Sequence, residues 1–208
     1  MIPKIIHYCW FGKNEKPELI RNCIDSWRRY CPDYEIVEWN EKNFDINMFP
    51  YTKEAYSVKK WAFVSDYARL YAVYSRGGIY LDTDVELLHP IDNLLNNTAW
   101  FVFQNDISVN TGLGFGAERN NSFVKKMMNY YENNHFIVKG KPNLSVGCPA
   151  INTEVLKTIQ DFALNGKTQY VSQRILVLSE MDYAKYAKHY GAMSWVEGVK
   201  PAKKYIKI

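Results

Sequence analysis

The first forty residues limit the fold most strongly, because their hydrophobic pattern changes from strand to helix and back to strand. PKIIHYCWF (residues 3–11) is a compact apolar run typical of a buried strand, and ELIRNCIDSWRRY (residues 18–30) repeats apolar residues at helical spacing. Pro17 suits the first turn of this helix, and Pro32 ends it. YEIVEW (residues 34–39) then alternates as a short strand. This order predicts a parallel sheet flanked by helices.

The rest of the chain continues to alternate between helices and strands. Residues 58–76, VKKWAFVSDYARLYAVYSR, are predicted to form a largely buried helix that ends at the Gly77-Gly78 pair. IYLDTDVELL (residues 79–88) is predicted to be the strand that follows. Further strands are expected in WFVF, GLGFGA and RILVLS, and further helices in SFVKKMMNYYENN and TEVLKTIQDFAL.

Composition and charge exclude several classes of protein. With 208 residues, 47% hydrophobic and 23% charged, the chain suits one globular α/β domain over residues 1–208. A net charge of +4 is too small and too scattered to indicate nucleic-acid binding. No stretch approaches the roughly 20 apolar residues of a membrane span, and the N-terminal sequence lacks the features of a secretory signal. We therefore expect a cytoplasmic protein with reduced thiols.

Two smaller features concern metals and membranes. The four cysteines contain no C-x-x-C pair and do not group with the four histidines, which argues against a zinc site. Four lysines gather in a short basic tail, residues 200–208: Lys200, Lys203, Lys204 and Lys207. Two interpretations of the tail stay open, a solvated frayed terminus and peripheral contact with the inner face of an anionic membrane. The second would favour a lipid-linked acceptor.

The octet GGIYLDTD (residues 77–84) is the strongest indication of chemistry. Along a continuous strand, Tyr80, Asp82, Asp84 and Glu86 would share one face. If the strand bends, the two aspartates come within roughly 5 Å, where their repulsion is about 3 kcal/mol at an effective dielectric near 20. A divalent cation would remove that repulsion, and magnesium or manganese accepts such oxygen ligands together with phosphate oxygens. Ligands also favour the carboxyl ends of strands in open α/β sheets.

Two other interpretations of this octet are considered. Both carboxylates can lie in water at a strand end, where their repulsion falls below about 1 kcal/mol. Aspartyl phosphatases of the haloacid dehalogenase group also carry D-x-D after an apolar strand, but they need threonine or valine where this chain has Glu86. They also need an acidic G-D pair downstream, which this sequence lacks.

Three motifs, in the same order, resemble glycosyltransferase family 32, which includes yeast mannosyltransferases, bacterial capsule and lipopolysaccharide transferases and, more distantly, the large clostridial glucosylating toxins. After the opening IPKIIHYCWFG, these are S-D-x-x-R, G-G-x-Y-x-D-x-D and, in HYGAMSW, H-x-x-x-x-S-W. The resemblance implies a GT-A-like nucleotide-sugar-binding fold with a mostly parallel central sheet flanked by helices. It also implies a divalent cation, Mn²⁺ or Mg²⁺, and transfer with retention of anomeric configuration.

The resemblance further implies roles for individual residues. Asp66 and Arg69 would hold the donor sugar and its diphosphate, although the pair also fits an ordinary i, i+3 helix contact. Tyr80 would donate its hydroxyl to the nucleotide or sugar, or else be a rim aromatic. Asp82 would meet the ribose or the metal, and Asp84 would bind the metal directly. The expected catalytic group is Asp66, Arg69, Asp82 and Asp84.

Five further residues complete the expected site. Trp10 would stack on the nucleotide base, although it equally suits a core position that closes the first strand. Ser194 and Trp195 match a loop that closes over the diphosphate in the toxin relatives, and His189 is a third candidate metal ligand. Asn110, in the glycine-rich VNTGLGFG segment, is expected near donor and acceptor, and Asp106 precedes it as a further candidate that would face the reacting carbon. A plain glycine-rich turn also explains both residues.

These inferences predict a metal-dependent, retaining glycosyltransferase that moves a hexose from a nucleotide-sugar to a hydroxyl of a saccharide acceptor. A UDP-sugar is favoured over GDP-mannose as the donor, and capsule, lipopolysaccharide or other surface-polysaccharide synthesis is the expected process. The alternative is a catalytically inactive protein of the same fold that binds carbohydrate or nucleotide-sugar. The four acidic and basic residues of the expected catalytic group argue for the enzyme.

Overall fold

A computed structural model describes residues 1–192 of the chain, and its helices and strands alternate as the sequence predicts. The helices are α1 (Glu18–Tyr30), α2 (Pro50–Ser57), α3 (Trp61–Arg76), α4 (Ser122–Glu132), α5 (Cys148–Leu156) and α6 (Glu180–Tyr183). The strands are β1 (Ile5–Cys9), β2 (Glu35–Trp39), β3 (Gly78–Tyr80), β4 (Val85–Leu87), β5 (Ala99–Asn105), β6 (Ser108–Val109), β7 (Phe115–Ala117), β8 (Ile137–Val138), β9 (Lys141–Pro142), β10 (Gln169–Val171), β11 (Ile175–Leu178) and β12 (Ala187–His189).

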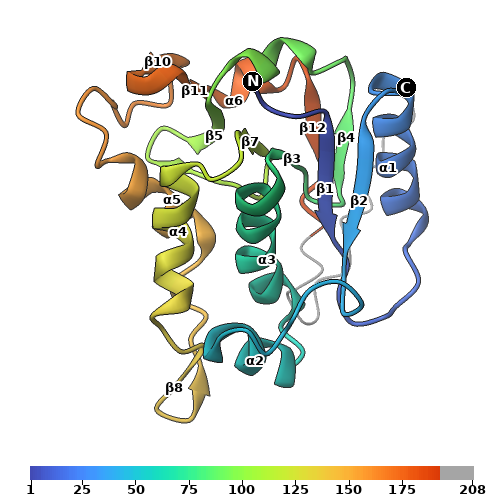
Figure 1. The fold of residues 1–208 in the computed structure, drawn as a ribbon, viewed down its shortest axis with the longest axis vertical. Helices are drawn as coiled ribbons and strands as arrows, with labels where there is room; N and C mark the ends of the chain where they lie inside the picture. Colours follow the sequence, from blue (N-terminus) through green and yellow to red (C-terminus); the bar gives the residue numbers. More distant parts are fainter. Residues whose placement is uncertain (193–208) are drawn as a thin grey trace.

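Within residues 1–192, a central sheet has the strand order β10-β11-β5-β7-β3-β1-β2, with β6 attached to β5 (Figure 1). β1 pairs in parallel with β2 and β3, and β11 pairs in parallel with β5. β7 lies antiparallel between β3 and β5, and β10 is antiparallel to β11. The sheet is therefore largely parallel, and β1, β2 and β3 end on the same edge.

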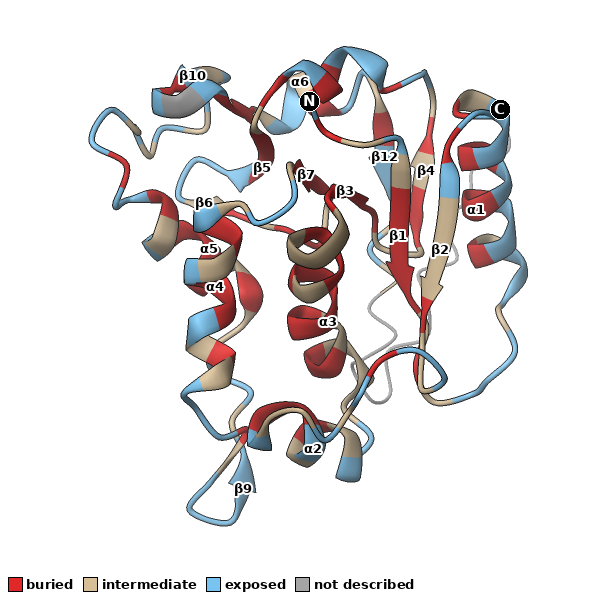
Figure 2. Cartoon of the chain, in the orientation of Figure 1, coloured by how far each residue is buried: buried red, intermediate tan, exposed pale blue. Residues whose placement is uncertain are grey.

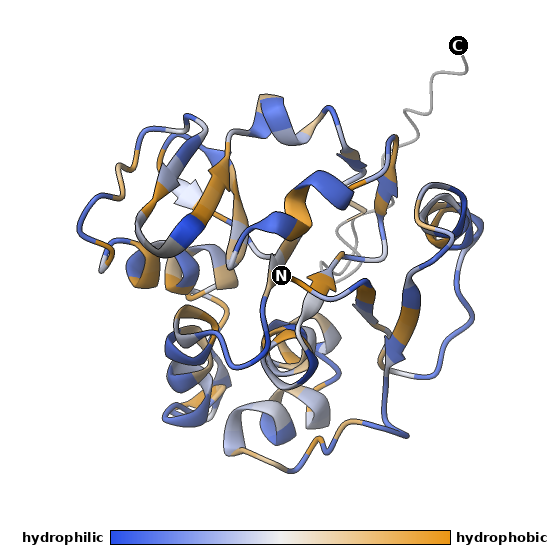
Figure 3. Cartoon of the chain, turned by 45° about the horizontal axis from the view of Figure 1, so that its top comes forward, coloured by the Kyte–Doolittle hydropathy of each residue, from blue (hydrophilic) through white to orange (hydrophobic). Residues whose placement is uncertain are grey.

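Two hydrophobic cores cover the two faces of this sheet. Successive residues of β5 divide between them, because Phe101 belongs to one core and Trp100 and Val102 to the other. Buried residues of α2, α3, α4 and α5 pack in the first core, and those of α1, α6, β4 and β12 pack in the second. Buried residues accordingly follow the strands and the helix faces turned toward them (Figure 2), whereas most connecting loops are hydrophilic (Figure 3).

Three sequence-based boundaries were wrong. The helix expected from residue 58 begins at Trp61, because the chain first leaves α2 with Lys59 in a left-handed conformation, φ 58°. The strand expected over residues 79–88 is interrupted between β3 and β4. The helix expected over residues 153–164 begins earlier, at Cys148, and ends at Leu156. Beyond that point Phe162 stacks on Phe103 of β5, with ring centroids 5.8 Å apart, so tertiary packing overrides the helical pattern.

Candidate active site

The turn between β3 and β4 carries Asp82 and Asp84. The backbone N–H of Val85 donates to the carbonyl of Asp82 at 3.0 Å, which closes the turn at the carboxyl end of β3. The two acids therefore do not share a face through regular strand alternation, as the continuous strand would require. They come together because the strand bends, which is the arrangement that makes their repulsion significant.

Arg69 joins α3 to this turn. Its Nη2 atom lies 3.1 Å from Oδ1 of Asp66 and 3.2 Å from Oδ1 of Asp82, and its Nε donates to the carbonyl of Ser65 at 3.2 Å. Only 5% of the Arg69 side chain and 11% of the Asp66 side chain are exposed. The pair expected at i, i+3 is therefore buried, and it extends to the first acid of the D-x-D motif.

Tyr80 lies under the same cluster. Its hydroxyl donates to Oδ1 of Asp82 at 2.8 Å, and the guanidinium carbon of Arg69 lies 4.9 Å from the centre of its ring. The phenol is thus already partnered within the protein, and it orients the Asp82 carboxylate. Tyr80 itself is buried rather than at the rim.

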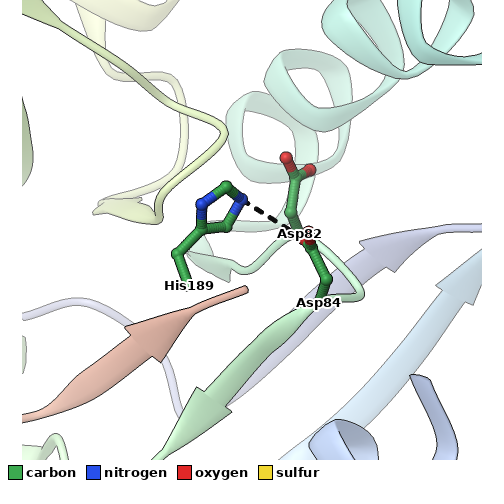
Figure 4. Close-up of side chains that lie close together, drawn as sticks. All are labelled: Asp82, Asp84 and His189. Atoms are coloured by element: carbon green, nitrogen blue, oxygen red, sulfur yellow. Dashed lines mark ion pairs between the residues drawn. The ribbon is translucent and has the colours of Figure 1, made fainter. Parts of the chain in front are cut away.

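Asp84 contacts a segment more than a hundred residues further along the chain. β12 pairs antiparallel with β4 and sets His189 opposite Val85. Nε2 of His189 lies 3.3 Å from Oδ1 of Asp84, and the N–H of Ala192 donates to Oδ2 at 2.7 Å. Figure 4 shows the imidazole pointing toward the turn, with the ion pair drawn between it and Asp84.

Asp82, Asp84 and His189 form a set of side chains that fits a divalent cation. One candidate ligand atom from each lies within 4.8 Å of the others. Carboxylate oxygens suit manganese and magnesium, and a single imidazole nitrogen is compatible with manganese. The sequence predicted one shared cation between the acids; in the structure each acid also has its own basic neighbour, Arg69 for Asp82 and His189 for Asp84.

The pKa values of the cluster reflect burial and these neighbours. Burial raises the pKa of Asp66 to about 6, against the opposing charge of Arg69. Burial and then the charge of Asp84 raise the pKa of Asp82, again against Arg69. Burial alone would raise the pKa of Asp84 and lower that of His189, but their mutual hydrogen bond and charges reverse both directions. Asp84 is therefore ionised at neutral pH, with His189 as its partner.

The glycine-rich segment after β6 approaches the D-x-D turn. Oδ1 of Asn110 accepts from the N–H of Gly112 at 2.7 Å. A Cβ atom added to Gly112 would lie 2.8 Å from Oδ2 of Asp82 and 3.1 Å from Nη1 of Arg69. The structure thus places Asn110 beside the cluster, and the absence of a side chain at Gly112 permits this close approach.

Cys148, which the sequence did not identify as a site residue, links these parts. Its thiol donates to Oδ1 of Asn110 at 3.3 Å and accepts from Nη1 of Arg69 at 3.6 Å. Burial raises the pKa of the thiol, so it stays protonated and keeps its S–H donor. No local signal marks this residue, because its contacts arise only when α5 packs against α3 and the 110–112 segment.

Trp10 lies just after β1, half-buried, at the same edge of the sheet. Its backbone N–H donates to the carbonyl of Trp39 at 2.9 Å, and its indole N–H donates to the carbonyl of Asn14 at 2.7 Å. The ammonium of Lys16 lies 5.5 Å from the centre of the indole ring. These contacts fix the ring while leaving part of it exposed.

Three further expected residues are Asp106, Ser194 and Trp195. Asp106 is exposed on the β5–β6 connection and packs against Gly166, whose added Cβ would lie 2.9 Å from the Cα of Asp106. Ser194 and Trp195 lie outside the described residues.

Residues 17–101, which contain all four members of the expected catalytic group, match the family described as "Glycosyltransferase sugar-binding region containing DXD motif". This part of the chain is therefore similar to a DXD-type sugar-binding region. The match confirms the resemblance seen in the sequence motifs. Trp10, Asn110, Cys148 and His189 lie outside the DXD region, and the fold brings Asn110, Cys148 and His189 to it.

Curated relatives match about half of the chain. Inositol phosphoceramide mannosyltransferase 3 of Schizosaccharomyces pombe is 36% identical over 111 residues, which cover 48% of this chain and 29% of that protein. Inositol phosphoceramide mannosyltransferase 1 of the same organism is 29% identical over 112 residues, covering 49% and 34%. The similarity therefore spans about a third of the length of these relatives.

The fold has a counterpart among solved structures. The protein titled "PaToxG Glycosyltransferase" superposes with a TM-score of 0.56 at 17% identity, over 76% of this chain and 68% of that chain. This likeness concerns the fold alone. The α/β, GT-A-like fold with a largely parallel sheet, predicted from the sequence, is confirmed.

Proposed function

We propose that this protein is a metal-dependent, retaining glycosyltransferase that moves a hexose from a nucleotide-sugar to a hydroxyl of a saccharide acceptor. One observation carries the proposal: Arg69, Asp82, Asp84 and His189 converge at the carboxyl end of β3, and the first three belong to the DXD region. Negative charge develops on a leaving diphosphate, and basic side chains and cations at that point stabilise it.

In the proposed complex, the protein's own residues bind and orient the donor. Asp66 and Arg69 hold the sugar and diphosphate, and the Asp82 contact with Tyr80 keeps that carboxylate directed toward the ribose or the cation. The exposed part of Trp10 supports the base. Asn110 faces the donor, and Ser194 and Trp195 remain proposed diphosphate contacts by resemblance. No side chain is assigned as the nucleophile behind retention.

Asp82, Asp84 and His189 would hold the cation, Mn²⁺ or Mg²⁺. When bound, such an ion neutralises charge on the diphosphate as a Lewis acid. His189 would then have a second role, because its imidazole also contacts Asp84 directly, with Nε2 3.3 Å from Oδ1. The shared use of Asp84 fits a site that binds its ion together with the donor rather than permanently.

We also propose the donor, the acceptor and the location of the protein. Resemblance to the toxin group favours a UDP-hexose, whereas the names of the curated relatives favour mannose and keep GDP-mannose as a candidate. The proposed acceptor is a saccharide or lipid-linked saccharide in surface-polysaccharide synthesis. We further propose a cytoplasmic location at the inner face of the membrane. Within residues 1–192, no helix has both the length and the apolar character needed to cross a bilayer.

The proposal is tested by incubating the pure protein with Mn²⁺ and a panel of UDP- and GDP-sugars, and following release of the nucleotide. Asp84→Asn should reduce turnover of the donor at least 100-fold while the protein remains folded, because the substitution removes a charged metal ligand. Asp25→Asn makes the same chemical change on the exposed face of α1 and should leave turnover unaltered. Full activity in Asp84→Asn would refute the assignment, and binding without turnover in the unaltered protein would favour an inactive sugar-nucleotide-binding protein.

A further inference from the structure

Residues 137–144, Ile-Val-Lys-Gly-Lys-Pro-Asn-Leu, form a hairpin with an unusual surface. β8 and β9 pair through Ile137–Pro142 and Val138–Lys141. Val138 is 47% exposed and Leu144 53% exposed, although both are large aliphatic residues. Lys139 and Lys141 are exposed between them, and residues 133–147 contain no aspartate or glutamate. We name residues 137–144 the basic hairpin.

The base of the basic hairpin is firmly attached to the protein. Glu54 of α2 accepts from the N–H of Ile137 at 2.8 Å with one carboxylate oxygen, and its other oxygen contacts Nδ1 of His135 at 2.6 Å. Phe136 is fully buried, with its ring centre 5.4 Å from that of Tyr51 and 4.9 Å from that of Phe63. The exposed aliphatic side chains are therefore presented on a fixed support and do not contribute to the core.

The basic hairpin is also close to the candidate active site. The strands β1 and β2 point toward the end of the molecule that carries α2 and the hairpin, and the hairpin projects there as an exposed element (Figures 1 and 2). Leu144 is four positions before Cys148 in the sequence, and Cys148 contacts Arg69. Since an extended chain spans at most about 3.6 Å per residue, Leu144 lies within about 14 Å of Cys148.

We propose that the basic hairpin is a docking surface for the headgroup region of a bilayer rich in anionic phospholipid. Lysines beside such a surface are attracted to it, and aliphatic side chains that flank them can enter the boundary between headgroups and acyl chains. The absence of acidic residues in this stretch makes its charge complementary to that surface. Docking here would present the candidate active site to an acceptor held in the membrane, a consequence that rests on the proposed function.

Other exposed hydrophobic residues provide an internal comparison. Tyr170 is 71% exposed and Met181 is 76% exposed, yet Met181 lies directly between Glu180 and Asp182. The acidic neighbours of Met181 repel an anionic surface rather than attract it. The inference therefore depends on the combination of apolar and basic residues, and not on exposure alone.

The experiment measures cosedimentation of the full chain with vesicles of phosphatidylcholine alone or with about a third phosphatidylserine. The unaltered protein should bind only the anionic vesicles. Lys139→Asn/Lys141→Thr should lower the partition coefficient roughly 10- to 30-fold, since each lysine near the surface contributes about fivefold. Asn is chosen because position 139 has φ 50°. Val138→Ser/Leu144→Ser should lower it about tenfold.

Three controls make the result decisive. Tyr170→Ser/Met181→Ser and Lys157→Ala/Lys185→Ala remove equivalent groups elsewhere and should not alter binding beyond about twofold. A full chain with Lys200, Lys203, Lys204 and Lys207 replaced by serine measures the contribution of the tail. Hairpin variants that bind like the unaltered protein, or equal binding to neutral vesicles, would overturn the proposal. Donor hydrolysis without vesicles should be unchanged in all hairpin variants, so loss of docking and loss of transferase activity are separable.

Discussion

Asp84 combines a structural role with the proposed ligand-binding one. Its Oδ1 faces His189 and its Oδ2 accepts from the N–H of Ala192. Because each carboxylate oxygen has two lone pairs, both contacts leave acceptor capacity for a cation. The carboxylate is therefore held in one orientation before any ligand binds, and the cost of ordering it does not fall on the ligand.

At the residue scale, Cys148→Ala should weaken donor binding about 3- to 10-fold. The substitution removes the partner of Nη1 of Arg69 and the donor to Asn110, and a typical net hydrogen bond contributes about 0.5–1.5 kcal/mol. Cys148→Ser keeps a donor and an acceptor at the same place and should recover most of the affinity. Isothermal titration with the best nucleotide-sugar of the panel measures both variants.

Cys31→Ala is the matched control for this prediction, because Cys31 is also a buried thiol but belongs to the core on the opposite face of the sheet. It should reduce stability without altering donor affinity. If Cys148→Ala and Cys31→Ala affect the affinity equally, Cys148 has no positioning role.

At the scale of elements, His7 fixes β1 against its neighbours. The ring is completely buried; Nε2 contacts the carbonyl of Gly77 at 2.9 Å, and Nδ1 accepts from the indole N–H of Trp39 at 3.1 Å. Burial lowers the pKa of His7 to about 4, from 6.5 in an unfolded chain. The neutral ring therefore joins β1 to β2 and to the junction of α3 with β3.

This pKa predicts a pH dependence of stability. The unfolded chain binds a proton at His7 below pH 6.5 and the folded chain only below about pH 4, so stability is lost as the pH falls through this interval. Between pH 7 and pH 5 the loss should be about 2 kcal/mol. Urea unfolding of the unaltered protein and of His7→Gln at both pH values measures it. The variant should be less stable at pH 7 but lose about 2 kcal/mol less on acidification, and parallel losses would contradict the assignment.

The elements that the sequence predicts well are those with a local cause. The apolar stripe of α1, the Gly77 boundary of α3 and the strands β1 and β2 follow from spacing and turn chemistry. Gly77 has φ 69° and donates its N–H to the carbonyl of Val73, as a helix-terminating glycine does. α2 was not predicted, because its eight residues show only a weak separation of apolar and polar faces.

The residues of the candidate site likewise fall into those that the sequence identifies and those that only the packing of distant elements reveals. Asp66, Arg69, Asp82 and Asp84 were identified because family motifs mark them, and their spacing is local in the sequence. Cys148 and Gly112 were missed, because what places them at the site is the packing of distant elements. Asp106 lies on the β5–β6 connection beside Gly166, and its expected place facing the reacting carbon stays a prediction. The assigned roles of these residues stay predictions.

At the scale of the whole molecule, hydrophobic cores cover both faces of one sheet within residues 1–192, and the single domain predicted over residues 1–208 stays a proposal. All four cysteines lack disulfide bonds, so cation binding is the principal candidate for ligand-dependent stabilisation. Such binding acts on the global unfolding equilibrium, because the ligands come from the β3–β4 turn and from β12.

Saturating Mn²⁺ should therefore raise the melting temperature by about 5 °C or more. A ligand at about 100 times its Kd contributes about 2.7 kcal/mol, and each kcal/mol shifts the midpoint by about 2–4 °C for a chain of this size. Differential scanning calorimetry with added Mn²⁺, and again after excess chelator, measures the shift. Asp84→Asn should abolish it, and an undiminished shift in that variant would place the ion elsewhere.

The pairing of β4 with β12 has a consequence for biosynthesis. Asp84 and the backbone group that caps it, the N–H of Ala192, are 108 residues apart. During translation the turn that carries Asp82 and Asp84 leaves the ribosome long before β12, which carries His189. Throughout that interval Asp84 lacks its contacts with His189 and Ala192. Assembly of the candidate site is accordingly a late event in synthesis of the chain, because it requires β12.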